Sequence, residues 1–144
     1  MEAQNYNNHK QYVFMFHVVL FFLLVVTVIG SFVNLFESIG DHSRIYSASL
    51  ITTLSISVLM LFFFARSFAT KAQDRAIRAE ENLRHFAITG KLLDSKLSVQ
   101  QIIALRFASD AEFVALAKKA VDENLSNDDI KKAVKNWRAD YHRV

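Results

Sequence analysis

The chain has 144 residues and a formal net charge of +3, and 52% of its residues are hydrophobic. It contains no cysteine, which excludes disulfide bonds, thiolate catalysis and iron–sulfur ligation, and fits a protein that faces a reducing compartment. It also contains no proline, so nothing in the sequence forces a helix to break, and we expect an all-α protein.

Two apolar stretches in the first half are long enough to cross a bilayer. The first, residues 13–33, is interrupted only by His17, Thr27, Gly30 and Ser31, and the second, residues 45–65, contains no charged side chain. Each is about 20 residues long, which matches a hydrocarbon core of roughly 30 Å. We predict transmembrane helices over 13–36 and 45–65. A cleaved signal peptide fits the first stretch less well, because the apolar run is too long and no small-residue cleavage motif follows it.

The two helices form a hairpin in this prediction, because the loop over 37–44 is short. Basic residues near membrane ends are retained on the cytoplasmic side. The loop has Arg44 alone, so it is expected to be external, with the N-terminal segment 1–12 and the C-terminal half both cytoplasmic. The basic residues that decide this are Lys10 before the hairpin and Arg66, Lys71, Arg75, Arg78 and Arg84 after it.

A stripe at heptad spacing begins at Phe62 and continues into the charged region after the second stretch. Its members are Ala65, Ala69, Ala72, Ala76, Ala79, Leu83 and Phe86. Alanine supplies little hydrophobic driving force but lets two helix backbones come close, so the stripe predicts a protein-binding face. The residues between the stripe positions are polar or charged, apart from Phe63, Phe64, Phe68 and Ile77.

The helix that carries the stripe is expected to continue to about Thr89, with a cytoplasmic extension over 66–90. Gly90 is a natural C-terminal stop. Exposed pairs at i,i+4 spacing, such as Glu80 with Arg84, support the extension by a few tenths of a kcal/mol each.

Three further helix starts predict a small bundle over 91–144. Ser98 with Gln101 and Ser109 with Glu112 match the capping box, and Ser126 with Asp129 is a weaker match. The expected helices cover 99–107, 110–124 and 127–141. A bundle this small needs support from elsewhere. The alanine stripe is the nearest candidate surface, and the sequence leaves open whether the stripe faces these helices or another copy.

Polar and small residues within the two apolar stretches are interpreted as intramembrane packing contacts. His17 lies near the cytoplasmic interface, where it is expected to bond to Ser67 or a backbone carbonyl across the hairpin rather than to ligate haem. The others form small or hydroxyl-bearing faces that let helices approach and bond. They are Gly30, Ser31 and Asn34 on the first stretch and Ser49, Thr53 and Ser57 on the second.

A basic group lies on the polar side of the last expected helix. Its members are Lys131, Lys132, Lys135 and Arg138. Such a group can bind anionic lipid headgroups or an acidic partner, although it is more often a solvated face. Nucleic-acid recognition is unlikely, because the same helix opens with Asn127, Asp128 and Asp129, which would repel the phosphates.

No motif in the chain indicates catalysis. It lacks a phosphate-binding loop, a dinucleotide fingerprint, a nucleophile elbow and a zinc-protease helix. Its histidines show no helical metal spacing. We therefore expect no enzymatic activity, no metal and no cofactor.

Several segments together resemble a family of small, functionally uncharacterised bacterial membrane proteins with two spans, common in Bacteroidota. They read QNYNNH, KAQDRAIRAEENLRHF, ITGKLLDSKL, IIALRFASD and IKKAVKNWRADYHRV. The resemblance implies a two-span protein of the bacterial inner membrane and contributes no catalytic residue.

The sequence therefore favours a non-catalytic membrane subunit or scaffold embedded in the lipid bilayer. It would bind further copies of itself, or a larger inner-membrane complex, through the stripe and the bundle. Two alternatives stay open: an oligomeric channel lined by the hydroxyl face of the second span, and a membrane tether for RNA, ribosomes or anionic lipid.

Overall fold

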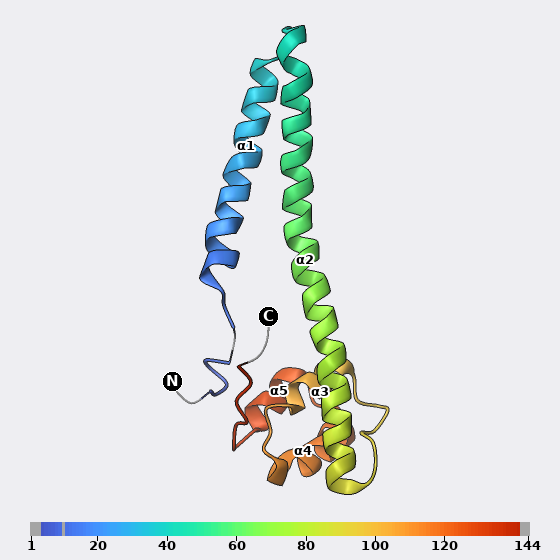
Figure 1. Ribbon diagram of the computed structural model, residues 1–144. Helices are drawn as coiled ribbons and strands as arrows, with labels where there is room; N and C mark the ends of the chain where they lie inside the picture. The colour runs from blue at the N-terminus through green and yellow to red at the C-terminus, as the bar shows by residue number, and fades with distance from the viewer. Residues whose placement is uncertain (1–3, 10, 142–144) are drawn as a thin grey trace. The chain divides into compact units, whose positions relative to one another are not determined.

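The computed structural model of the protein describes residues 4–9 and 11–141, which form helices and connecting segments (Figure 1). The expected all-helical class is confirmed. The elements are a short π-helix η1 (Met15–Leu20), α1 (Phe21–Glu37), α2 (His42–Thr89), α3 (Val99–Leu105), α4 (Asp110–Asp122) and α5 (Asn127–Ala133). The chain divides into two compact units, Tyr12–Ala69 and a second that combines Met1–Gln11 with Thr70–Val144.

The first unit is an antiparallel hairpin of α1 and the membrane-length part of α2 (Figure 1). A tight turn joins the two helices. Gly40 takes a positive φ of 94° there, and the buried Ser38 hydroxyl donates to the Asn34 carbonyl at 2.7 Å. Asp41 then caps α2, since its carboxylate accepts from the backbone N–H of Ser43 at 3.0 Å.

Small residues form the contact between the two helices of the hairpin. Ser31 on α1 and Ala48, Thr52 and Ser55 on α2 are all less than a tenth exposed. The Thr52 hydroxyl donates to the Ser31 carbonyl across the hairpin at 3.0 Å. Small side chains with an interhelical hydrogen bond are the packing mode that holds helices together in lipid, where no hydrophobic force acts between them.

The outward surface of the hairpin is apolar. Large side chains such as Phe22, Leu54 and Leu61 are about 60% exposed (61%, 65% and 62%). The segments Met15–Glu37 and His42–Thr89 are both long and apolar enough to cross a membrane, and only 6% and 17% of their most apolar windows are buried in the chain. A core helix of a water-soluble protein would bury such a surface, so the exposure favours lipid contact.

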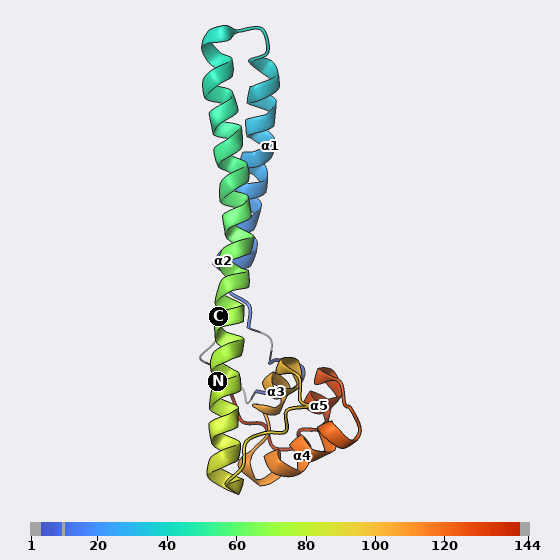
Figure 2. The same cartoon turned by 90° about the vertical axis from the view of Figure 1, so that its right-hand side faces the viewer.

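The second unit has a small hydrophobic core built by α3, α4 and α5 on one side of the last turns of α2 (Figure 2). Phe107 and Phe113 lie at its centre and are essentially fully buried, as are Leu105 and Ile130. From α2, Ile77 is 6% exposed, and the Asn82 side chain accepts the Leu93 backbone N–H at 3.3 Å. The bundle is therefore supported by α2, as its small size requires.

The expected helix starts are confirmed by their caps. Ser98 accepts the Gln101 backbone N–H at 3.3 Å, and Gln101 accepts the Ser98 backbone N–H at 2.8 Å, which is a complete capping box. Ser126 accepts the Asp129 backbone N–H at 3.1 Å. Gly90 ends α2 with a φ of 72°.

The last helix is much shorter than the expected 127–141, so that prediction was wrong. α5 ends at Ala133, Val134 is extended, and Trp137 pairs with Ala108 in an isolated antiparallel bridge. Glu112 holds this segment away from helical geometry. Its carboxylate accepts the backbone N–H groups of Lys135 at 3.1 Å and Asn136 at 3.0 Å, so a tertiary contact overrides the helical pattern.

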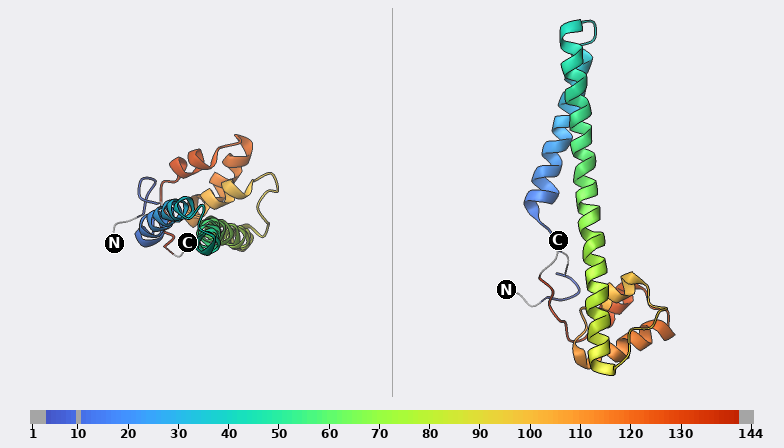
Figure 3. Two further views of the ribbon diagram at one scale, coloured as in Figure 1. Left: turned by 90° about the horizontal axis from the view of Figure 1, so that it is seen from above. Right: turned by 45° about the vertical axis from the view of Figure 1, so that its right-hand side comes forward.

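The N-terminal segment belongs to the second unit and packs on the bundle rather than forming a separate element. The Tyr6 hydroxyl donates to the Asp128 carboxylate at 2.8 Å. His9 is 7% exposed, and its ring lies 5.6 Å from Phe107 and 5.8 Å from Trp137. Figure 3 shows this segment beside the one that follows α5.

Replacing Glu112 with glutamine is expected to destabilise the second unit by about 1–2 kcal/mol at neutral pH, because one carboxylate oxygen becomes an amide NH2 group that cannot accept a backbone N–H. Burial raises the pKa of Glu112, but hydrogen bonds from the backbone N–H groups of Asn136, Lys135 and Ser109 outweigh it and lower the pKa overall. The stabilisation is therefore present above the ordinary glutamate pKa and is lost as pH falls through the lowered folded value.

The measurement is thermal unfolding of the detergent-solubilised protein against pH. The matched control is Glu123→Gln, which removes an exposed carboxylate 3.8 Å from Lys119 and is expected to change little. An E112Q variant as stable as the wild type at neutral pH would refute the role of Glu112.

Candidate interaction site

Arg84 joins α2 to the bundle through contacts on four sides. Its guanidinium lies 2.9 Å from Glu81 Oε2 and 2.7 Å from Asp110 Oδ1, and it donates to the Ala108 carbonyl at 2.7 Å. It also lies over the Phe113 ring, 4.3 Å from the centroid. Its side chain is only 11% exposed and that of Glu81 is 4% exposed, so their ion pair is largely shielded from water, whereas Asp110 is 77% exposed.

Glu81 is the buried carboxylate of this network. It is 3% exposed, and besides Arg84 it faces Arg138, whose guanidinium lies 3.5 Å from Oε1. A carboxylate this buried is tolerated because two cations neutralise it. The sequence pairing of Glu80 with Arg84 is not the one observed, since Arg84 turns toward Glu81 and Asp110.

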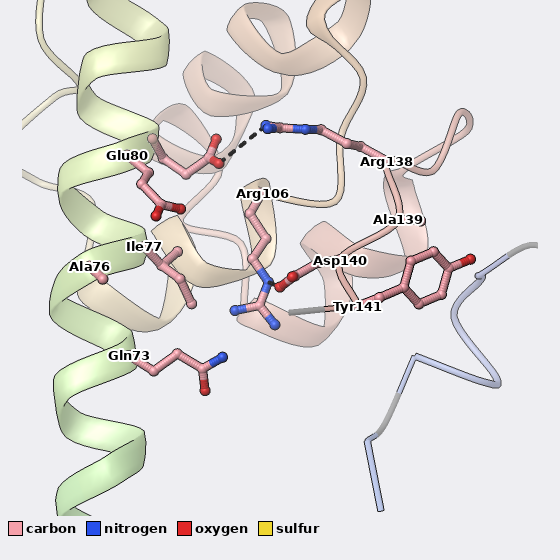
Figure 4. Close-up of a pocket in the computed structure, with 10 residues that line it drawn as sticks. Gln73, Ala76, Ile77, Glu80, Arg106, Arg138, Ala139, Asp140 and Tyr141 are labelled. Carbon is pink, nitrogen blue, oxygen red and sulfur yellow. Dashed lines mark ion pairs between the residues drawn. The ribbon is translucent and has the colours of Figure 1, made fainter. Parts of the chain in front are cut away.

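A polar cavity of about 540 Å³ lies beside this network, between α2 and the segment after α5 (Figure 4). Gln73 and Ile77 project into it from α2 toward Arg106, whose Nε lies 3.1 Å from Asp140 Oδ2. The other charged residues at its wall are Glu80, Glu81 and Arg138. Since acids and bases line it together, and Arg106 pairs with Asp140 and Arg138 with Glu81, the cavity carries no strong charge preference.

The alanine stripe lies on a different face of α2 from the bundle. Ala72, Ala76 and Ala79 are exposed, Leu83 is 68% exposed and Phe86 is 51% exposed. Of the two possibilities that the sequence leaves open, the structure does not place the bundle on the stripe. The bundle uses the face of Ile77, Glu81 and Arg84 instead, because these side chains offer apolar area and charge that alanine lacks. Earlier in the stripe, Ala65 is exposed and Ala69 is half-buried within the hairpin unit.

The signal for the true docking face was present in the sequence. Ile77 is the apolar residue that does not fit the stripe, and Glu81 follows it at i+4 on the same face. The contacts of Arg84 had no such signal, because Ala108 and Asp110 lie more than twenty residues further along the chain. Tyr6 and His9 were also missed, since a short polar segment shows no periodicity.

The residues expected to pack within the membrane differ in whether they lie at the contact between α1 and α2. Ser31 lies at the interhelical contact, and Asn34 is half-buried and accepts the Ser38 hydroxyl. Gly30 is exposed, and a methyl group added there would meet open space. On α2 the contact falls on Ala48, Thr52 and Ser55. The three hydroxyl residues that the sequence analysis named on this stretch donate to backbone carbonyls of α2 itself. They are Ser49, Thr53 and Ser57.

His17 bonds within its own segment rather than across the hairpin. Its Nδ1 lies 2.9 Å from the Val13 carbonyl oxygen and 3.1 Å from the Val13 backbone nitrogen. The Tyr12 ring stacks on it at 4.8 Å. Over the described residues, no cluster of three His, Cys, Asp or Glu side chains forms a metal site. His142 lies outside the described residues.

The basic group near the C-terminus is partly neutralised within the chain. Lys132 lies 2.8 Å from Asp128, and its hydrogen bond with that carboxylate raises the pKa of Lys132. Arg138 faces Glu81. Lys135 is exposed and Lys131 is half-buried. Contact of these residues with lipid or an acidic partner stays a prediction.

The chain belongs to a family of unknown function (DUF6526), whose model matches residues 1–144. The expected resemblance to an uncharacterised family is thus confirmed. The chain matches no curated protein and no solved structure.

Replacing Arg84 with methionine is expected to destabilise the second unit by about 3–5 kcal/mol, because Glu81 would remain buried with a weaker partner. Adding Glu81→Leu removes that buried charge, so the double variant should recover part of the loss. Thermal unfolding and protease resistance of the solubilised protein measure both effects. The control is Arg78→Met, which changes an exposed arginine of the same helix. A double variant less stable than R84M would contradict this account.

Proposed function

We propose that this protein is a non-catalytic, membrane-anchored scaffold. The hairpin holds it in the bilayer, and the exposed stripe of α2 binds a helix of a protein partner. The bundle packs on one face of α2 and leaves the stripe on the other face accessible to the partner. No catalytic role is assigned to any residue.

One observation carries this proposal: the bundle occupies one face of α2 and leaves the stripe uncovered. Over residues 72–86, roughly the opposite side of the helix carries Ile77, Glu81 and Arg84, which the bundle covers. Leu83 and Phe86 lie one helical turn apart and are 68% and 51% exposed, and adjoining exposed apolar side chains of this kind are typical of a protein-binding surface.

The N-terminal segment supports a topology with both ends of the chain on one side of the membrane. Tyr6 and His9 contact Asp128, Phe107 and Trp137, which supports placing residues 4–9 and the bundle in the same compartment. The excess of Lys and Arg after the second span favours the cytoplasm. The resemblance to bacterial two-span proteins favours the inner membrane.

The two alternatives have less support. The hydroxyls of Ser49, Thr53 and Ser57, which would line a channel, already donate to carbonyls of their own helix. A tether for RNA or anionic lipid needs free cations, whereas Lys132 and Arg138 face Asp128 and Glu81. We therefore rank the scaffold first.

A photoreactive benzophenone amino acid placed at Leu83 or Phe86 is expected to capture a partner in intact membranes, giving a product of higher mass. The same probe at Arg78, which is exposed but off the stripe, is the matched control and should give several-fold less product. Absence of any product at both stripe positions would overturn the proposed function.

A further inference from the structure

Resting on the proposed function, we propose that the partner of α2 is a second copy of this chain, bound parallel and in register over residues 72–86. The two copies would form a short two-stranded coiled coil just outside the membrane. The interface is isologous, so each copy contributes the same surface.

The apolar positions of this segment fit the a and d sites of a heptad. Ala76 and Leu83 fall at a, and Ala72, Ala79 and Phe86 fall at d. The exposed Leu83 and Phe86 supply the hydrophobic area. The three alanines, which precede them along α2, let the two backbones approach closely. The bundle covers the far side of α2, and all five of these side chains are exposed.

The direction of pairing follows from the membrane anchor. Two copies held in one bilayer by the same hairpin present α2 in the same direction, so their helices meet parallel. In a parallel coiled coil, a residue at g faces the residue at e of the next heptad on the other helix, five positions further on.

The charges at these flanking positions are complementary. Arg75 falls at g and Glu80 at e, so each Arg75 faces Glu80 of the second copy, twice by symmetry. Both residues are exposed, and among the described residues neither forms an ion pair within the chain. An antiparallel pairing places g opposite g and loses both contacts. The surface is therefore complementary to itself in one orientation.

Disulfide trapping tests the register, because the chain contains no cysteine and an introduced thiol is the sole one present. Ala79→Cys at a d position brings the two thiols together across the axis, within the range that a disulfide requires. We expect it to form a covalent dimer in oxidised membranes about tenfold faster than Arg78→Cys, whose side chain points away. Equal rates for the two variants would overturn the proposal.

Charge reversal tests the same interface without a crosslink. Arg75→Glu is expected to weaken dimerisation about fivefold, measured by energy transfer between labelled copies in vesicles, and Arg75→Glu with Glu80→Arg should restore it. Reversal of the off-interface Arg78 is the control. If the double variant stays as weak as R75E, the parallel register is wrong.

The two proposals fail differently. If a benzophenone at Leu83 captures another protein and Ala79→Cys forms no dimer above the control, the proposal of a second copy is overturned. The proposed scaffold function is then unaffected. No capture at Leu83 or Phe86 overturns both.

Discussion

The contacts of Arg84 are the interaction on which the second unit depends. One guanidinium links the second half of α2 to the start of α4 and to the central Phe113. A bundle of this size has too little apolar area to hold its position by burial alone. The hydrogen bonds and ion pairs of Arg84 also fix the orientation of the bundle, because the donors of a planar guanidinium can be satisfied in few geometries. The bundle consequently docks on one defined face of α2.

The parts of the fold that local chemistry determines were predictable from the sequence. The length of α2 follows from an uninterrupted helical pattern and its end from Gly90, whose positive φ suits glycine. The starts of α3 and α5 follow from serine caps, which act within four residues. In each case the residues that decide the structure are close neighbours in the chain.

The parts that were mispredicted depend on distant residues. The helical pattern from 127 to 141 is genuine, yet Glu112 binds the backbone at Lys135 and Asn136 and Trp137 packs on Phe107. The docking face of α2 was left open by the sequence for a similar reason. Heptad spacing identifies the apolar stripe, but it does not say which neighbour covers that stripe. In the structure the bundle packs on the face that carries Ile77, Glu81 and Arg84.

The docking of the N-terminal segment has a consequence for how the protein is made. The hydrogen bonds that tie Gln4 to Asp140 and Tyr6 to Asp128 join residues 136 and 122 positions apart. Because the chain is synthesised from its N-terminus, residues 4–9 have no docking surface until almost all of it has emerged. The hairpin is complete long before then, so it can form before the second unit closes.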